Sequence, residues 1–186
     1  MISVNTSKLS IATTLVALCV ATNYVLVGVP QVKAMDFIVF IGGFCFGAYT
    51  GVFIGIFSWA VYGVLNPYGF VPQVWLATMF SEAIYGFLGG LLGKNFAVTD
   101  FNDGPLKLSV FFGTMGFILT LIYDLVVNCA YASAFGIPIV TAIVVGMPFT
   151  ILHQVSNVAI FGVCSIPVIG VLGKLSGDEW FGVLKK

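Results

Sequence analysis

Arginine is absent from this sequence, and charged residues of any kind are scarce. Only 8% of the 186 residues are charged, against roughly 25% in an average soluble domain, and seven basic residues balance seven acidic ones. The chain has no guanidinium groups to bind phosphates and no basic surface to attract a nucleic acid. Nucleic acid is therefore excluded as a partner.

Motifs for catalysis and metal binding are also missing. The single histidine and four scattered cysteines give neither an ordinary metal site nor a disulfide framework. The glycines before Lys94 have the wrong spacing for a nucleotide-binding loop, and Asn95 stands where Ser or Thr is required. We therefore expect that the protein binds no metal or cofactor, does not hydrolyse ATP and is not an enzyme. Only carboxylate-and-histidine chemistry at Glu82, Asp124 and His153 stays open.

Apolar residues make up most of what is present. They account for 60% of the chain, and the mean hydropathy is +1.11. A membrane-spanning helix needs about 20 mostly apolar residues, so the chain has room for about six spans and no separate soluble domain. The sequence predicts an all-α integral membrane protein, a single bundle of about six transmembrane helices over residues 1–186, surrounded by the lipid bilayer.

Glycine, proline and polar clusters divide the apolar sequence. The predicted spans are 9–27, 36–46, 48–65, 73–93, 108–132 and 148–166, the second and third joined by a tight turn near Phe46 and Gly47. The first is too long, and too poor in flanking basic residues, for a cleaved signal peptide. Because Gly146 and Pro148 interrupt the last apolar stretch, we expect 138–147 to be an interfacial or re-entrant segment.

The lysines predict the orientation, because short cytoplasmic loops are enriched in basic residues. With six spans and a cytoplasmic amino terminus, only Lys33 is external, and the cytoplasmic lysines are Lys8, Lys94, Lys107, Lys174, Lys185 and Lys186. We expect a multi-pass protein of the cell membrane with both termini in the cytoplasm.

Polar side chains inside spans are costly and are functional candidates by default. Most of them fall in the outer half of the predicted bundle, which predicts a cavity open to the outside. Asp124 with Asn128, and His153 with Asn157, are four residues apart and so share a helix face. The candidate binding residues are Asn23, Trp59, Asn66, Glu82, Tyr85, Asp124, Asn128, His153 and Asn157.

Each candidate also has a purely structural interpretation. Asn, Gln and Thr commonly hydrogen-bond between helices, worth about 0.6 kcal/mol each. For Glu82 and Asp124 a functional role is favoured, because a carboxylate in hydrocarbon costs about 2.5 kcal/mol or more. His153 fits a structural bond, a carboxylate partner or a ligand contact equally well. Asp36 is interpreted as a helix cap at the interface.

Four stretches together resemble the substrate-binding S components of energy-coupling factor transporters. They are 29–36 after the first span, the glycine-rich turn at Phe46 and Gly47, 123–128 in the fifth span and 148–157 in the sixth. The resemblance implies six helices, capture of a vitamin or similar micronutrient from outside, and association with a transmembrane coupling subunit and two ATPase subunits. It also implies that Ala17 and Ala21 form the docking surface.

The sequence limits the chemical class of the substrate but does not identify the molecule. The absence of arginine weighs against a polyanion, and Glu82, Asp124 and the aromatic residues favour a neutral or cationic heteroaromatic vitamin or precursor. Two other functions remain open. A membrane scaffold would use these polar residues only to hold helices together, and a standalone secondary carrier would transport without ATPases.

Overall fold

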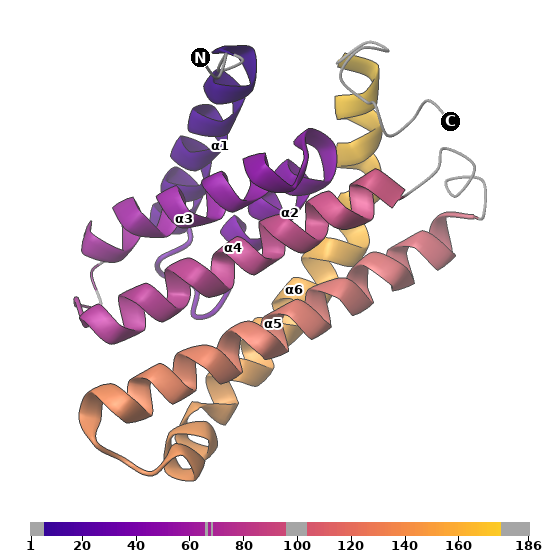
Figure 1. Cartoon of the computed structure of the whole chain (residues 1–186). Coiled ribbons are helices and arrows are strands. Elements are labelled where there is room, and N and C mark those ends of the chain that lie inside the picture. Colours follow the sequence, from indigo (N-terminus) through magenta and orange to yellow (C-terminus); the bar gives the residue numbers. More distant parts are fainter. Residues whose placement is uncertain (1–5, 66, 68, 96–103, 176–186) are drawn as a thin grey trace.

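Six helices form the structure, a computed structural model that describes residues 6–65, 67, 69–95 and 104–175. None of these residues lies in a strand. The helices, shown in Figure 1, are α1 (Thr6–Val25), α2 (Met35–Phe46), α3 (Ala48–Leu65), α4 (Pro72–Asn95), α5 (Pro105–Phe135) and α6 (Ile139–Leu175). The predicted all-helical bundle is confirmed.

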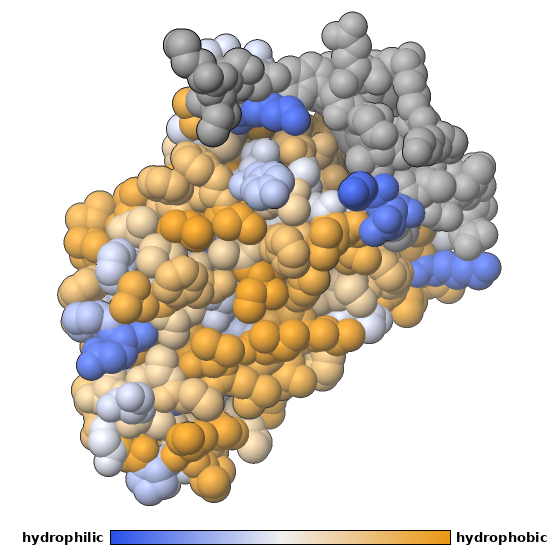
Figure 2. Space-filling view, viewed as in Figure 1, coloured by the Kyte–Doolittle hydropathy of each residue, from blue (hydrophilic) through white to orange (hydrophobic). Residues whose placement is uncertain are grey.

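All helices except α2 are long and apolar enough to cross a membrane. Many large apolar side chains point outward from them, and Figure 2 shows a mainly hydrophobic surface on which hydrophilic residues are isolated. Such a surface is stable against lipid chains and not against water. The chain therefore has the features of a multi-pass membrane protein.

The short helix α2 lies at the centre of the bundle, packed against α1, α3, α4 and α6. Its 12 residues rise only about 18 Å, so α2 alone is too short to cross a bilayer. Ten of the 12 residues are buried, and Figure 1 shows the helix behind α3 and α4. Met35 and Asp36, the first two residues of α2, are buried, so the helix begins inside the bundle. The connection from α1 therefore reaches into the protein interior.

Glycines allow α2, α3 and α4 to approach closely. Gly47 has a φ of 96° and joins α2 to α3 with no further loop, as the sequence predicted. A Cβ atom on Gly43 or Gly51 would collide with the backbone of Gly86 in α4. These contacts fix the three helices side by side, and they place Glu82, one turn before Gly86, against α3.

The helix α6 corrects one prediction. Residues 138–147 do not form a separate interfacial or re-entrant segment, and the helix does not begin at Pro148; one helix of 37 residues contains both Pro148 and Pro167. A proline removes a single backbone hydrogen bond, and in an apolar environment continuing the helix satisfies all the others. Likewise α5 extends beyond the predicted 108–132, and α6 beyond 166.

The helix α1 lies at the edge of the bundle. Only Ala12, Cys19 and Asn23 are buried among its 20 residues, and Ala17 and Ala21 are exposed. It ends at Val25, two residues before the predicted end of the span. The beginning of α1 and the end of α6 lie at the same end of the bundle, the top of Figure 1.

Candidate functional site

A cluster of buried polar side chains lies where α2, α4, α5 and α6 meet, and Asp36 is at its centre. The Oδ2 atom of Asp36 is 2.7 Å from Nε2 of His153 and accepts a 2.7 Å hydrogen bond from Nδ2 of Asn157. All three side chains are almost completely buried. Asp36 therefore joins α2 to α6. Its interpretation as a helix cap is wrong, because it makes no cap hydrogen bond and its carboxylate contacts His153 and Asn157 instead.

His153 connects two carboxyl groups. Its Nδ1 atom lies 3.0 Å from Oδ1 of Asp124, opposite the contact of Nε2 with Asp36. Each contact needs one proton between its two heavy atoms. The ring is then an imidazolium between two carboxylates, or a neutral imidazole beside one protonated carboxyl. In both cases the three groups together carry one negative charge.

Thr120 extends the cluster toward α4. Its Oγ1 atom accepts hydrogen bonds from Nδ2 of Asn157, at 2.7 Å, and from the hydroxyl of Tyr85, at 2.9 Å, and it donates to the carbonyl of Gly116. Side chains on α4, α5, α6 and α2 are thus linked in an unbroken chain of bonds. We call Asp36, Tyr85, Thr120, Asp124, His153 and Asn157 the polar network.

An aromatic group lies beside the polar network. The indole N–H of Trp59 donates to Oε2 of Glu82 at 3.1 Å, and the Tyr123 ring packs edge-on against the His153 ring with 5.7 Å between centroids. The ammonium of Lys33 lies over both aromatic rings, 5.5 Å from the centroid of Trp59 and 5.4 Å from that of Tyr123. We call Lys33, Trp59, Glu82 and Tyr123 the aromatic side of the cluster.

The cluster contains more hydrogen-bond acceptors than donors. Within the described part of the chain, no N–H or hydroxyl group donates to four of its buried oxygens, which are Asp36 Oδ1, Glu82 Oε1, Asp124 Oδ2 and Asn157 Oδ1. Glu82 and Asp36 are also hydrogen-bond partners of each other, which requires a proton on one of the two carboxyl groups. A buried acceptor left without a donor costs free energy. The cluster is therefore complementary to a molecule that carries several donors or a positive charge.

The structure brings six of the predicted binding residues together, namely Trp59, Glu82, Tyr85, Asp124, His153 and Asn157. The sequence predicted that these residues line an open cavity. The structure differs, because each of the six residues is at most 9% exposed. The shared face of His153 and Asn157 is confirmed, since both contact the same oxygen of Asp36.

The remaining predicted residues lie elsewhere. Asn128 donates to the backbone carbonyl of Asp124 and packs against Gly146, so its side chain does not enter the cluster. Asn23 is buried on α1, where its amide contacts the sulfur of Met35 at 3.7 Å. Asn66 lies outside the described residues. Ala17 and Ala21, the predicted docking residues, lie on the exposed face of α1.

The predicted binding residues omit four members of the cluster. Asp36 is predicted to be a helix cap, Lys33 enters the prediction only through the orientation, and Thr120 and Tyr123 are not among the candidates. A signal existed for Thr120, since it lies four residues before Asp124 and so shares its helix face. Lys33 gave no comparable signal, because a lysine in a connection is normally solvated.

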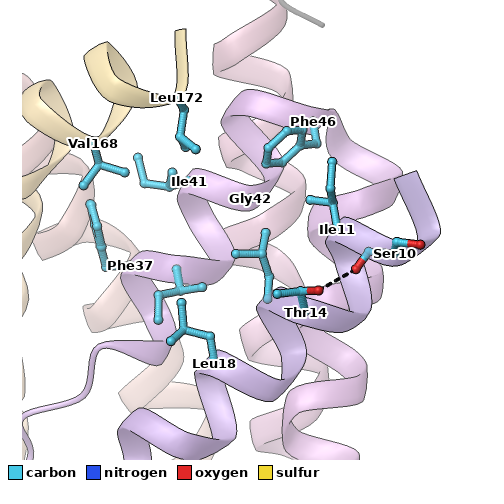
Figure 3. A pocket seen from close by; sticks show the side chains of 12 residues that line it. Ser10, Ile11, Thr14, Leu18, Phe37, Ile41, Gly42, Phe46, Val168 and Leu172 are labelled. Atoms are coloured by element: carbon cyan, nitrogen blue, oxygen red, sulfur yellow. Dashed lines mark hydrogen bonds between the residues drawn. The ribbon is translucent and has the colours of Figure 1, made fainter. Parts of the chain in front are cut away.

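A groove in the surface lies away from this cluster. It has a volume of about 690 Å³ and runs between α1, α2 and α6. Figure 3 shows its lining, with Phe37, Ile41 and Leu172 on one side and the hydroxyls of Ser10 and Thr14 on the other. Thr14 and Ser10 already bond to helix carbonyls. The groove therefore offers space without polar recognition.

Neither a metal site nor similarity to known proteins identifies the function of this cluster. Among the residues described, no three His, Cys, Asp or Glu side chains are arranged to hold a metal ion. Neither a protein-family model, nor a curated protein, nor a solved structure matches the chain.

Proposed function

We propose that the protein is a substrate-binding membrane subunit that captures a small donor-rich molecule in the polar cluster. The observation that carries this proposal is the concentration of three carboxyl groups and one amide in one buried cluster, each with an oxygen to which no N–H or hydroxyl group donates. A cluster that served only to hold helices together is expected to satisfy its own acceptors. A ligand with N–H or O–H groups would supply the missing donors.

The proposed transport role is that of an S component of an energy-coupling factor transporter. The six-helix bundle and the cluster at its centre support this role, together with the sequence resemblance and the lack of a nucleotide-binding loop. The cargo is a vitamin or similar micronutrient, and uptake requires a coupling subunit and two ATPase subunits. Lysine distribution supports an orientation in which Lys33 faces outside and both termini are cytoplasmic.

The helix α1 is the proposed docking surface for the coupling subunit. It buries few residues within the bundle, and its exposed face carries the small side chains of Ala17 and Ala21. Small residues let a partner helix approach closely in a membrane. Substitution of both alanines by leucine is expected to leave ligand binding intact and to prevent assembly with the ATPase subunits.

Native mass spectrometry of the chain purified in mild detergent tests the binding function. We expect a stoichiometric small molecule to co-purify, and Glu82→Gln to weaken its binding at least tenfold. Glutamine is isosteric with glutamate and still accepts the Trp59 hydrogen bond, so the fold should persist while the carboxyl group is lost. A thermal unfolding midpoint close to that of the wild type would confirm that only the ligand site has changed.

A membrane scaffold is the second candidate function, because the polar network does join four helices. It predicts that Glu82→Gln changes stability alone. The binding function is contradicted if no molecule co-purifies and a broad panel of vitamins and precursors fails to raise the unfolding midpoint. A standalone carrier predicts uphill uptake into vesicles that hold the purified chain and no ATPase.

A further inference from the structure

Among the residues that the structure describes, Lys33 is the only cation close to the carboxylates that belongs to no helix. It lies in the connection between α1 and α2, and its charge acts on both Asp36 and Glu82. Yet both ion pairs found within the described residues are made by His153. The Lys33 ammonium instead lies over the faces of Trp59 and Tyr123, a position that attracts cations because of the negative face of each ring.

The walls around this ammonium are rigid and buried. Trp59 is 8% exposed and Tyr123 3%, and each belongs to a long helix. The carboxyl of Glu82 is oriented by the Trp59 indole, and its second oxygen is buried without a donor. Two aromatic faces next to a buried carboxylate make up a site for a positively charged group.

The segment that carries Lys33 is held more loosely than these walls. It is attached to α6 through one hydrogen bond, from Oγ of Ser156 to the carbonyl of Gln31 at 2.9 Å. Gln31 has a φ of 57°, which is unfavourable for a residue with a side chain. Lys33 itself is only partly buried. Moving its side chain away from the rings therefore breaks no helix and no bond of the polar network.

We infer that Trp59, Tyr123 and Glu82 form a subsite for an organic cation, and that Lys33 is a tethered occupant which the cationic group of the substrate displaces. This inference rests on the proposed binding function and adds the chemical class of the substrate. The displaced lysine side chain moves outward, and the cationic group of the substrate takes its place over the two rings. The donors of the substrate face the carboxyl groups of Glu82 and Asp36.

Charge accounting supports a cation over a neutral molecule. His153, Asp36 and Asp124 together carry one negative charge, and Lys33 supplies the compensating positive charge in the cluster. If Lys33 leaves and a neutral molecule enters, the buried carboxylates lose that compensation, which is costly in a low-dielectric interior. A cationic substrate restores it.

Removal of the tethered competitor tests the inference. A tethered group competes at a millimolar effective concentration, so Lys33→Met is expected to tighten the binding of benzyltrimethylammonium about tenfold. Lys33→Arg keeps a cation on the same tether and should bind the probe about as the wild type does. Binding to the full chain in lipid nanodiscs is measured by titration calorimetry, with benzenesulfonate as the matched anion, which should not bind more tightly.

A second variant guards against indirect effects. In a Lys33→Met/Tyr123→Leu double variant one wall of the site is gone, and the tenfold gain should disappear, whereas Lys33→Met/Tyr123→Phe should retain it. The inference is overturned if Lys33→Met leaves the affinity unchanged or lowers it, if Lys33→Arg tightens binding as much as methionine does, or if no variant binds the probe.

Failure of this inference is separable from failure of the binding function. A co-purifying molecule that is lost on Glu82→Gln, yet binds more weakly to Lys33→Met, would leave the binding function in place and make Lys33 a direct ligand contact. If no molecule co-purifies and no vitamin or precursor stabilises the protein, the binding function itself fails.

Discussion

The polar network and the aromatic side of the cluster lie next to each other but are held in different ways. In the network, bonds of 2.7 to 3.0 Å join side chains of α2, α4, α5 and α6. On the aromatic side, Glu82 has one donor, and Lys33 is held by ring contacts from a nonhelical segment. The difference suggests a division of roles, in which the network fixes the helices and the aromatic side exchanges its occupant.

Removal of the central acceptor should give the largest change. Asp36→Ala leaves His153 and Asn157 without their shared partner, and breaking a buried pair of this kind costs about 3 kcal/mol of unfolding free energy. Reversible unfolding in mixed micelles of mild detergent and dodecyl sulfate measures the loss. A change below about 1 kcal/mol, the range typical of single interhelical bonds, would show that the network does not hold the helices.

A smaller loss is expected for Thr120→Val. Valine has the shape of threonine, but it leaves the Tyr85 hydroxyl and the Asn157 amide without their acceptor, which costs about 1 kcal/mol. Thr114→Val on the same helix is the matched control, because the Thr114 hydroxyl is exposed and bonds only to the carbonyl of Val110. Equal losses in the two variants would contradict the assignment of Thr120 to the network.

The smallest change in stability is expected on the aromatic side. Trp59→Phe keeps an aromatic ring and removes the indole donor of Glu82, and the loss should be about 0.6 kcal/mol. The same variant should weaken ligand binding clearly, since Glu82 is no longer oriented. Both are measured on one preparation, by unfolding and by calorimetry. A stability loss as large as that of Asp36→Ala would remove the distinction between the two sides.

Much of the fold could be predicted because residues that break helices, and polar residues within apolar runs, are easy to recognise in an apolar sequence. The tight turn at Gly47 follows from a glycine-rich run too long for one span. The face shared by His153 and Asn157 follows from their spacing of four. Pro148 misled the prediction, because a proline looks like a boundary in sequence, whereas a buried apolar helix can continue through it.

The site could be predicted only in part, because the depth at which a residue is buried depends on the tertiary structure. Asp36 stands at the first turn of its helix, and a helix start is normally placed at the membrane interface. Here α2 begins inside the bundle, because glycine contacts position it against α3 and α4. The position of Lys33 over two rings likewise depends on how the connection folds back, which no spacing of residues in the sequence encodes.

The location of His153 and Asn157 on the last helix has a consequence for how the protein is made. Synthesis proceeds from the amino terminus, so Asp36 and Asp124 emerge from the ribosome before their partners on α6 exist. Until then these acids have to remain protonated, stay near water or be shielded by the insertion machinery, because bare carboxylates in lipid are costly. Arrival of α6 completes the cluster, which makes insertion of α6 the step at which these buried acids gain their partners.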